Sequence, residues 1–256
     1  MLPPEPEISD EIISFSLPTD ENAFAELSAS ARFEDVGKGR RGATLARIDE
    51  TDRVPLVRTT SQYGSPTQKF RAVHERLAQR IQERAAFPVG FNNALIESYT
   101  NAYKTMGSHS DQALDLADES FIAVFSCYEH PEAAPQRKLI FESKGSPVGK
   151  FEIPLAHNGV VAFSADSNRR LKHKIVLDPA ATSDNPWLGV TFRTSKTFIR
   201  FRDGHAYLPQ GARLTPADDE QRREFYQLRR RENNETDFIY PLLTYTVSES
   251  DLMPPV

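Results

Sequence analysis

The residues of this chain best suited to chemistry are a histidine and an aspartate two positions apart, with a second histidine much later: His109, Asp111 and His173. Residues i and i+2 of an extended segment point to the same side, so His109 and Asp111 can hold one ion together. A histidine from a distant segment completes a three-point face and leaves the other positions of the metal open. A set of two histidines and one carboxylate is typical of non-haem Fe(II) oxygenases.

The segments around these residues have the composition of short strands and turns. Residues 94–99 alternate in the manner of a half-buried strand, and 104–108, which include Gly107, favour a turn that delivers His109. Downstream, short β-branched or aromatic runs separated by turn residues cover 121–128, 137–143, 159–164, 173–177, 188–194 and 197–201. This spacing predicts one antiparallel β-structure.

Four further motifs stand in a fixed order around the three candidate ligands. They are Val54-Pro55 with Arg58 and Tyr63-Gly64, Asn101-Ala102-Tyr103, Gly159 to Phe163 leading through Asn168 to His173, and Thr191-Phe192-Arg193. The ordered set resembles the AlkB-like branch of the iron(II)- and 2-oxoglutarate-dependent dioxygenases over roughly residues 54–201.

The resemblance implies a mainly β fold with flanking helices (α+β), a double-stranded β-helix or jelly-roll barrel that holds its site in the barrel mouth. It implies Fe(II) bound by His109, Asp111 and His173, with 2-oxoglutarate and O2 as cosubstrates. It also implies hydroxylation of a C–H bond, and oxidative demethylation of an N-alkylated nucleobase, with DNA or RNA as the partner. Such a base must be flipped out and stacked; Tyr63 and Trp187 are candidates for stacking and Arg58 for contact with phosphate.

For 2-oxoglutarate, the first candidate anchor is Arg193, because its planar guanidinium can bind a carboxylate through two hydrogen bonds. Asn101 and Tyr103 are the expected neutral donors.

The chain departs from the family pattern at the second cation of the cosubstrate site. Position 187, where the family usually has an arginine, is Trp187, and Gly189 stands where an asparagine is common. A buried unpaired carboxylate is costly, so another cation is needed; Lys196 and Arg200 are the candidates in the sequence.

Other functions remain open at this point. The net charge of −5 opposes simple nucleic-acid binding, which favours a hydroxylase of a small metabolite or of a protein side chain as the alternative. A non-catalytic binding module is the third hypothesis. A zinc hydrolase would use similar ligands, but the chain has no His-Glu-x-x-His motif.

The length of 256 residues predicts one domain in four parts. These are an acidic, partly disordered arm (1–35), lid-like strands with a bracing helix (36–93), the catalytic core (94–201), and a C-terminal helix and strand packed on the core (202–256). Helices are expected within 21–36, 67–84 and 216–233, and an edge strand within 238–247.

The composition predicts an intracellular, soluble protein of the cytoplasm or nucleus. No apolar run approaches the ~18 residues that span a bilayer, and there is no basic and apolar leader. The single cysteine, Cys127, excludes an internal disulfide. Basic clusters at 38–41 and 169–172 could flank the site, although such clusters are more often solvated or paired with acids. The oligomeric state is left open.

Overall fold

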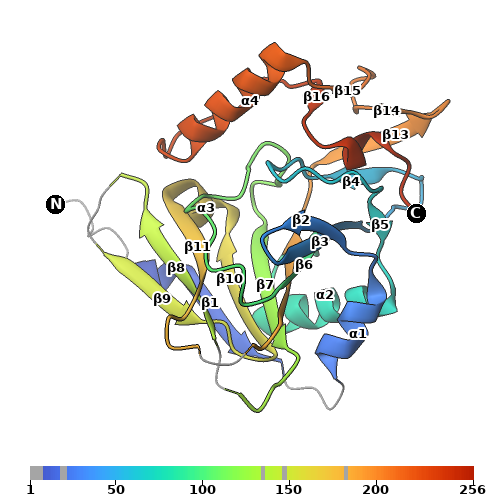
Figure 1. The fold of residues 1–256 in the computed structure, drawn as a ribbon. Coiled ribbons are helices and arrows are strands. Elements are labelled where there is room, and N and C mark those ends of the chain that lie inside the picture. Colours follow the sequence, from blue (N-terminus) through green and yellow to red (C-terminus); the bar gives the residue numbers. More distant parts are fainter. Residues whose placement is uncertain (1–7, 18–21, 134–135, 146–148, 182–183) are drawn as a thin grey trace.

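Two antiparallel β-sheets pack face to face in the computed structural model, which describes residues 8–17, 22–133, 136–145, 149–181 and 184–256 (Figure 1). The larger sheet runs in the order β1 (Ile12–Ser16), β10 (Gly159–Ser164), β7 (Phe121–Tyr128), β12 (Trp187–Arg193), β6 (Asn93–Tyr99), β3 (Arg40–Ala46) and β2 (Glu34–Gly37), and β5 (Gln68–Lys69) pairs with β3. The smaller sheet runs in the order β11 (Leu171–Leu177), β8 (Arg137–Ser143) and β9 (Lys150–Pro154).

The strands from β6 to β12, together with the segment around His109, are divided between the two sheets and form the double-stranded β-helix. The order β10-β7-β12-β6 gives one wall, and β11-β8-β9, extended by the pairing of His109 with His173, gives the other. The predicted fold class is therefore confirmed. Strands β7, β8 and β10 have the predicted bounds, because each is an apolar run closed by turn residues at both ends.

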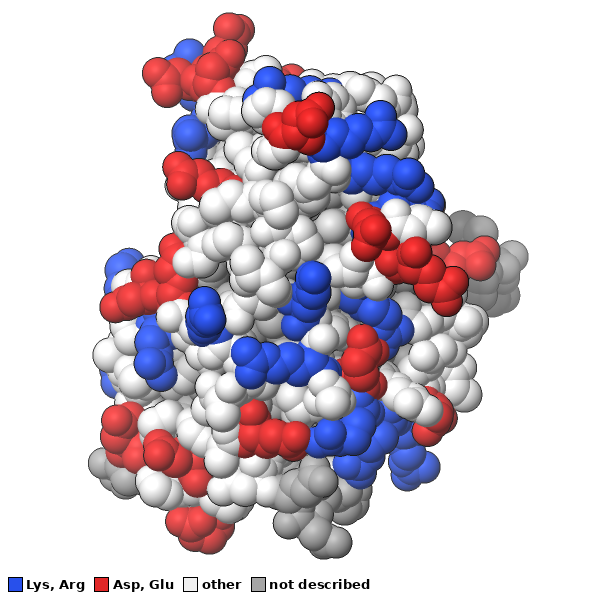
Figure 2. All heavy atoms as spheres, turned by 90° about the vertical axis from the view of Figure 1, so that its right-hand side faces the viewer, with Lys and Arg blue, Asp and Glu red and all other residues white. Residues whose placement is uncertain are grey.

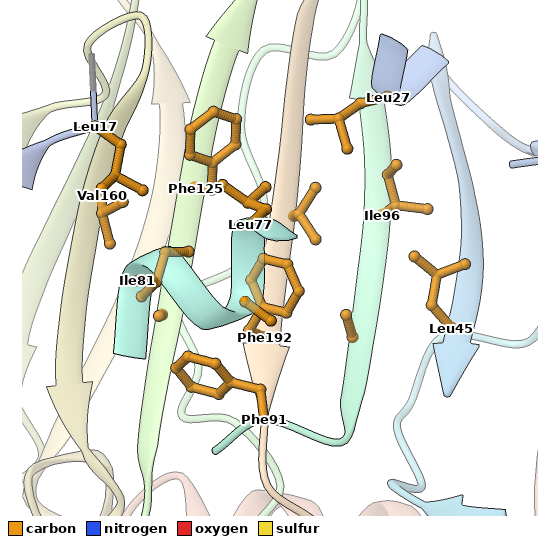
Figure 3. Close-up of a cluster of buried hydrophobic side chains, with 14 of the residues drawn as sticks. Leu17, Leu27, Leu45, Leu77, Ile81, Phe91, Ile96, Phe125, Val160 and Phe192 are labelled. Carbon is orange, nitrogen blue, oxygen red and sulfur yellow. The ribbon is translucent and has the colours of Figure 1, made fainter. Parts of the chain in front are cut away.

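Two helices cover the outer face of the larger sheet, α1 (Ala23–Ser30) and α2 (Ala72–Ala85). Leu77 and Ile81 lie one turn apart on α2 and are buried against the sheet, where they meet side chains such as Phe125 and Phe192 (Figure 3). This apolar periodicity is the one that predicts a helix within 67–84. None of the helices in the described ranges is long and apolar enough to cross a bilayer.

A second apolar core fills the space between the two sheets. It contains Tyr99, Phe141, Phe163 and Trp187, each at most 1% exposed, from both walls of the barrel. With helices on one face and the smaller sheet on the other, every residue of β6 is buried. The expectation of a half-buried strand there is wrong, since the sequence alternation does not reveal that both faces are covered.

The N-terminal segment belongs to the larger sheet, at least in part. Strand β1 pairs with β10 from Ile12–Phe163 to Ser16–Gly159, and a 3-10 helix (Ile8–Glu11) precedes it. Residues 1–7 and 18–21, on which the expected disorder of the arm would also fall, lie outside the described residues. Strand β9 and helix α3 (Ala165–Arg170) are further elements that the sequence did not indicate.

The C-terminal part packs over the open end of the barrel with β4 (Val54–Leu56), β13 (Thr197–Arg202) and β14 (His205–Tyr207) (Figure 1). The predicted helix is α4 (Asp219–Glu232), followed by the 3-10 helix Glu249–Leu252. Within 238–247, where an edge strand was predicted, the structure has only the short strand β16 (Tyr245–Thr246). It pairs in parallel with β15 (Thr215–Pro216). The remainder of 238–247 has no strand partner among the described residues.

A buried ion pair ties this C-terminal part to the barrel. Arg58 donates from its backbone N, its Nε and its Nη2 to the Asp115 carboxylate at 2.9, 3.0 and 2.9 Å. Its Nη1 donates to the carbonyl oxygens of Leu243 and Tyr245. Asp115 is fully buried and Arg58 is 3% exposed, so each charge depends on the other for compensation.

Replacing Asp115 with alanine is therefore expected to destabilise the protein by about 3–5 kcal/mol, because the Arg58 charge stays buried without its partner. The matched control is Asp118→Ala, which breaks exposed pairs with Arg169 and Lys196 and should cost below about 1 kcal/mol. Urea unfolding of the two variants measures both values. Equal losses would contradict the role given to the buried pair.

Candidate metal centre

Backbone pairing between two distant segments brings the two histidines together. His109 N donates to the His173 carbonyl at 3.0 Å, and His173 N donates to the His109 carbonyl at 2.7 Å. Residues that face each other directly in an antiparallel pair project to the same side. The ring centroids of the two imidazoles consequently lie 4.7 Å apart.

The alternation of β11 explains why His173 faces the barrel interior although lysines flank it. Buried and partly exposed residues alternate along the strand, and His173, at 6% exposure, occupies a buried position while Lys172 and Lys174 point outward. His173 is therefore buried in the barrel, although it follows the basic cluster 169–172 directly in the chain.

Asp111 completes the group from the same side as His109. Its Oδ1 lies 3.8 Å from Nε2 of His109 and 3.6 Å from Nε2 of His173. One candidate ligand atom from each of the three residues lies within 4.8 Å of the other two, a spacing that one ion between them can bridge. The three sequence-predicted metal residues thus come together, with two nitrogens and one oxygen.

Hydrogen bonds orient the ligands before any ion binds. The Gly107 carbonyl lies 2.9 Å from His109 Nδ1, so this nitrogen carries the proton and Nε2 keeps its lone pair for a metal. Asp111 is held through its backbone: its N–H donates to Asn168 Oδ1 at 2.8 Å, and Asn168 Nδ2 donates to its carbonyl at 2.7 Å.

The electrostatics of the site favour metal-binding protonation states. Burial, together with the adjacent His109, lowers the pKa of His173 to about 3, and burial also lowers the pKa of His109. Burial alone would raise the pKa of Asp111, but Arg193 and the two imidazoles outweigh it and hold that pKa below its usual value. At neutral pH both imidazoles are uncharged and the carboxyl is ionised, as metal ligands must be.

Arg193, the expected anchor for 2-oxoglutarate, lies next to Asp111 at the candidate metal centre. Its Nε donates to Asp111 Oδ2 at 2.6 Å, which leaves Oδ1 for an ion. Its two terminal nitrogens make no hydrogen bond to any residue that the structure describes. Arg193 can therefore fix Asp111 and still offer two donors to a carboxylate.

A cavity of about 360 Å³ opens from the candidate metal centre, within the size range of small-molecule sites. Its charged lining consists of three arginines and two carboxylates besides the imidazoles: Arg40, Arg193, Arg229, Glu97 and Asp111. An apolar part is lined by Leu95, Val124, Leu139 and Ile175, and a polar part by Thr59, Thr60, Ser61, Tyr103, Ser108, Gln112 and Thr191.

The two departures from the family pattern turn out to be a single structural change. The Trp187 indole is 1% exposed, donates to Ser126 Oγ and lies across Gly189. A Cβ on Gly189 would lie 2.1 Å from Trp187 Cη2, so the ring occupies this place only because position 189 has no side chain. The indole fills the barrel interior where the family pattern has an arginine.

Several expected site residues do not reach the cavity. Arg58 belongs to the buried pair with Asp115, Tyr63 is 2% exposed with its hydroxyl on Glu97, and Trp187 belongs to the core. None of these three side chains lines the cavity, and their expected contacts with a substrate base are corrected accordingly.

The expected cosubstrate residues divide in the same way. Tyr103 lines the cavity, whereas Asn101 does not; its Nδ2 donates to Gln136 and its backbone N–H to Asp184. Lys196 pairs with Asp118 and Arg200 is exposed near Thr51. Neither of these two cations lines the cavity.

Arg40, a cation that the sequence did not single out as a site residue, lines the cavity. It comes from the basic cluster 38–41, lies with its guanidinium carbon 5.9 Å from the centre of the Tyr103 ring and pairs with Glu97. Its Nη2 also donates to Ser61 Oγ at 2.9 Å, and its guanidinium interacts with the hydroxyls of Tyr63 and Tyr103. The sequence indicates a basic cluster at 38–41, but it does not show which of its side chains points inward. The pairing of β3 turns Arg40 toward the cavity and leaves Arg41 exposed.

No protein-family model and no curated protein matches the chain. Among solved structures, the fold is similar to that of OsALKBH1, an AlkB homologue, at 14% identity and a TM-score of 0.49, over 72% of this chain and 96% of that one. It is also similar to a Pseudomonas putida prolyl-4-hydroxylase at 13% identity and a TM-score of 0.42, over 73% and 96% of the two chains.

If the three residues hold an ion, a divalent metal must stabilise the folded chain. Mn(II) at about 100 times its Kd should raise the free energy of unfolding by about 2.7 kcal/mol, since the unfolded chain has no formed site. His173→Ala should lose this gain, whereas His130→Ala should keep it, because His130 is exposed in a distant turn. Urea unfolding with and without Mn(II) provides the measurement. A full gain in His173→Ala would show that the ion binds elsewhere.

Proposed function

We propose that this chain is an Fe(II)- and 2-oxoglutarate-dependent dioxygenase of AlkB type. The observation that supports it most directly is the convergence of His109, Asp111 and His173 at the wall of a cavity with room for further ligands. Two neutral imidazoles and one carboxylate on one side of an ion suit Fe(II) and leave positions for cosubstrate and O2. Closed structural zinc sites, in contrast, use four protein ligands.

Bound at this site, Fe(II), 2-oxoglutarate and O2 would supply an oxidation that yields succinate and CO2 and places one oxygen atom in a C–H bond of the substrate. The residues of the chain have simpler tasks. The imidazoles and Asp111 would hold the ion, and Arg193 keeps the carboxylate of Asp111 in place. The apolar wall of the cavity would exclude water from the reacting groups.

The charged lining of the cavity suits a dicarboxylate. Arg193 offers its two terminal nitrogens near the ion, and Arg40 presents its guanidinium to the cavity with Tyr103 beside it. Trp187 occupies the place of the usual second arginine, so we assign the second carboxylate of 2-oxoglutarate to Arg40. Glu97 is the present partner of Arg40 and would compete with that carboxylate.

The lining of the cavity and the charge of the surface bear on the class of substrate. An N-alkylated nucleobase remains the candidate implied by the AlkB-like motifs. Two observations favour a small metabolite or a protein side chain instead. Among the described residues, Tyr103 is the one aromatic ring in the cavity lining besides the imidazoles, which leaves little surface for stacking a base. Figure 2 shows a face on which basic and acidic side chains are interspersed, without a continuous positive surface.

The reaction class is tested by succinate formation from 2-oxoglutarate. Fe(II) should be required, and His109→Ala or Asp111→Ala should reduce the rate at least ~100-fold, because the loss of one ligand removes the ion or opens its geometry. Circular dichroism of each variant checks the fold. Succinate formation at the wild-type rate by either variant would refute the proposal.

The nucleobase substrate is tested separately by measuring binding of the protein to single-stranded DNA or RNA. A lack of binding at ~50 mM salt would exclude this substrate.

The assignment of Arg40 makes two predictions of opposite sign. Arg40→Gln should raise the KM for 2-oxoglutarate about tenfold or more, since a hydrogen bond between charged groups contributes about 1.5–3 kcal/mol. Glu97→Gln should lower the KM, because it removes the internal competitor while its amide oxygen still accepts from the Tyr99 hydroxyl. The control is Arg41→Gln on the outward side of the same strand. If both Arg40→Gln and Glu97→Gln leave the KM unchanged, Arg40 is not the anchor.

A further inference from the structure

The backbone around Asp111 is held by side chains from the end of helix α4, more than a hundred residues later in the chain. The Ser110 N–H donates to Asn233 Oδ1 at 2.9 Å, and the Ser110 hydroxyl donates to the same atom at 3.1 Å. The Ala113 N–H donates to Glu232 Oε1 at 2.7 Å, and Arg229 Nη2 donates to the Ser110 carbonyl at 2.8 Å. Four hydrogen bonds to Ser110 and Ala113, on either side of Asp111, thus come from one helix end.

These bonds replace strand pairing that the segment lacks. Residues 110–113 belong to no strand, although Ser110 is fully buried and Asp111 is 6% exposed. Buried backbone groups without partners are costly, and here the side chains of α4 serve in place of a neighbouring strand. Asn168 of α3 holds Asp111 itself from the other side, through both its N–H and its carbonyl.

The helix end is itself fixed on two sides. Tyr240 donates to Glu232 Oε2 at 2.6 Å, and Lys144 Nζ donates to the Glu232 carbonyl at 2.6 Å. The body of α4 is anchored separately, since Phe225 and Leu228 pack with Leu243 and Tyr245 in an apolar cluster of their own. The loss of one polar contact at the helix end should therefore leave the helix docked.

We infer that Asn233, with Glu232 beside it, is a positioning residue for the metal centre: it fixes the backbone of Ser110 and thereby the direction of the Asp111 carboxylate toward the imidazoles. This inference rests on the metal binding contained in the proposed function. Groups that orient metal ligands typically change the affinity for the metal 10- to 100-fold when they are lost.

The test is a Mn(II) titration of the full chain, with the Kd followed by electron paramagnetic resonance, alongside the Tm of the metal-free protein. Asn233→Ala should weaken Mn(II) binding about tenfold or more. Asn233→Asp keeps an acceptor for the Ser110 N–H and should bind Mn(II) close to the wild type. The matched control is Asn234→Ala, whose exposed side chain bonds only to the Arg230 carbonyl and should leave the Kd unchanged.

The outcomes separate the inference from the function on which it rests. If Asn233→Ala lowers the Tm but binds Mn(II) like the wild type, Asn233 has a structural role only and the inference is overturned. If His173→Ala and the wild type bind Mn(II) equally, the triad is not the metal site, and the proposed function falls together with the inference. A weakened Kd in Asn233→Ala that Asn233→Asp restores would support it.

Discussion

The register between β11 and the segment around residue 109 is the constraint on which the candidate site depends. Two reciprocal backbone hydrogen bonds place His109 directly opposite His173, and the two-residue period of extended chain then brings Asp111 to the same side. A slip by one residue would turn every side chain of one partner to the opposite face. The hydrophobic alternation of β11 prevents this slip, because it would expose Leu171 and Ile175 and bury lysines.

Buried charges at the candidate ligands and in the protein around them are compensated by ion pairs. Asp111 lies between Arg193 and the imidazoles, and the nearby pairs Arg40–Glu97 and Arg58–Asp115 are also largely buried. Each pair is a liability if either member is lost, because the remaining charge has no water to solvate it. Arg40 and Arg193 therefore both maintain the fold and contribute positive charge to the cavity, whereas Arg58 lies outside the cavity and maintains the fold.

The sequence predicted the parts of the structure that depend on local pattern. The strands at 121–128, 137–143 and 159–164 could be predicted from apolar runs that end at turn residues. The candidate metal ligands could be predicted because histidine and aspartate are residue types that bind metal ions. The parts that depend on distant partners could not be predicted. Nothing near Arg58 reveals that Asp115 neutralises it, and nothing near residue 233 reveals that its amide faces Ser110. The same holds for β1, whose acidic and proline-containing surroundings conceal a strand that needs β10 to form.

The indole of Trp187 lying over Gly189 means that these two positions cannot be varied independently. A side chain at 189 would collide with the ring, and an arginine at 187 would bring a charge into an apolar interior. A larger residue at 189 therefore requires a smaller one at 187, so the effects of substitutions at the two positions on stability are not additive.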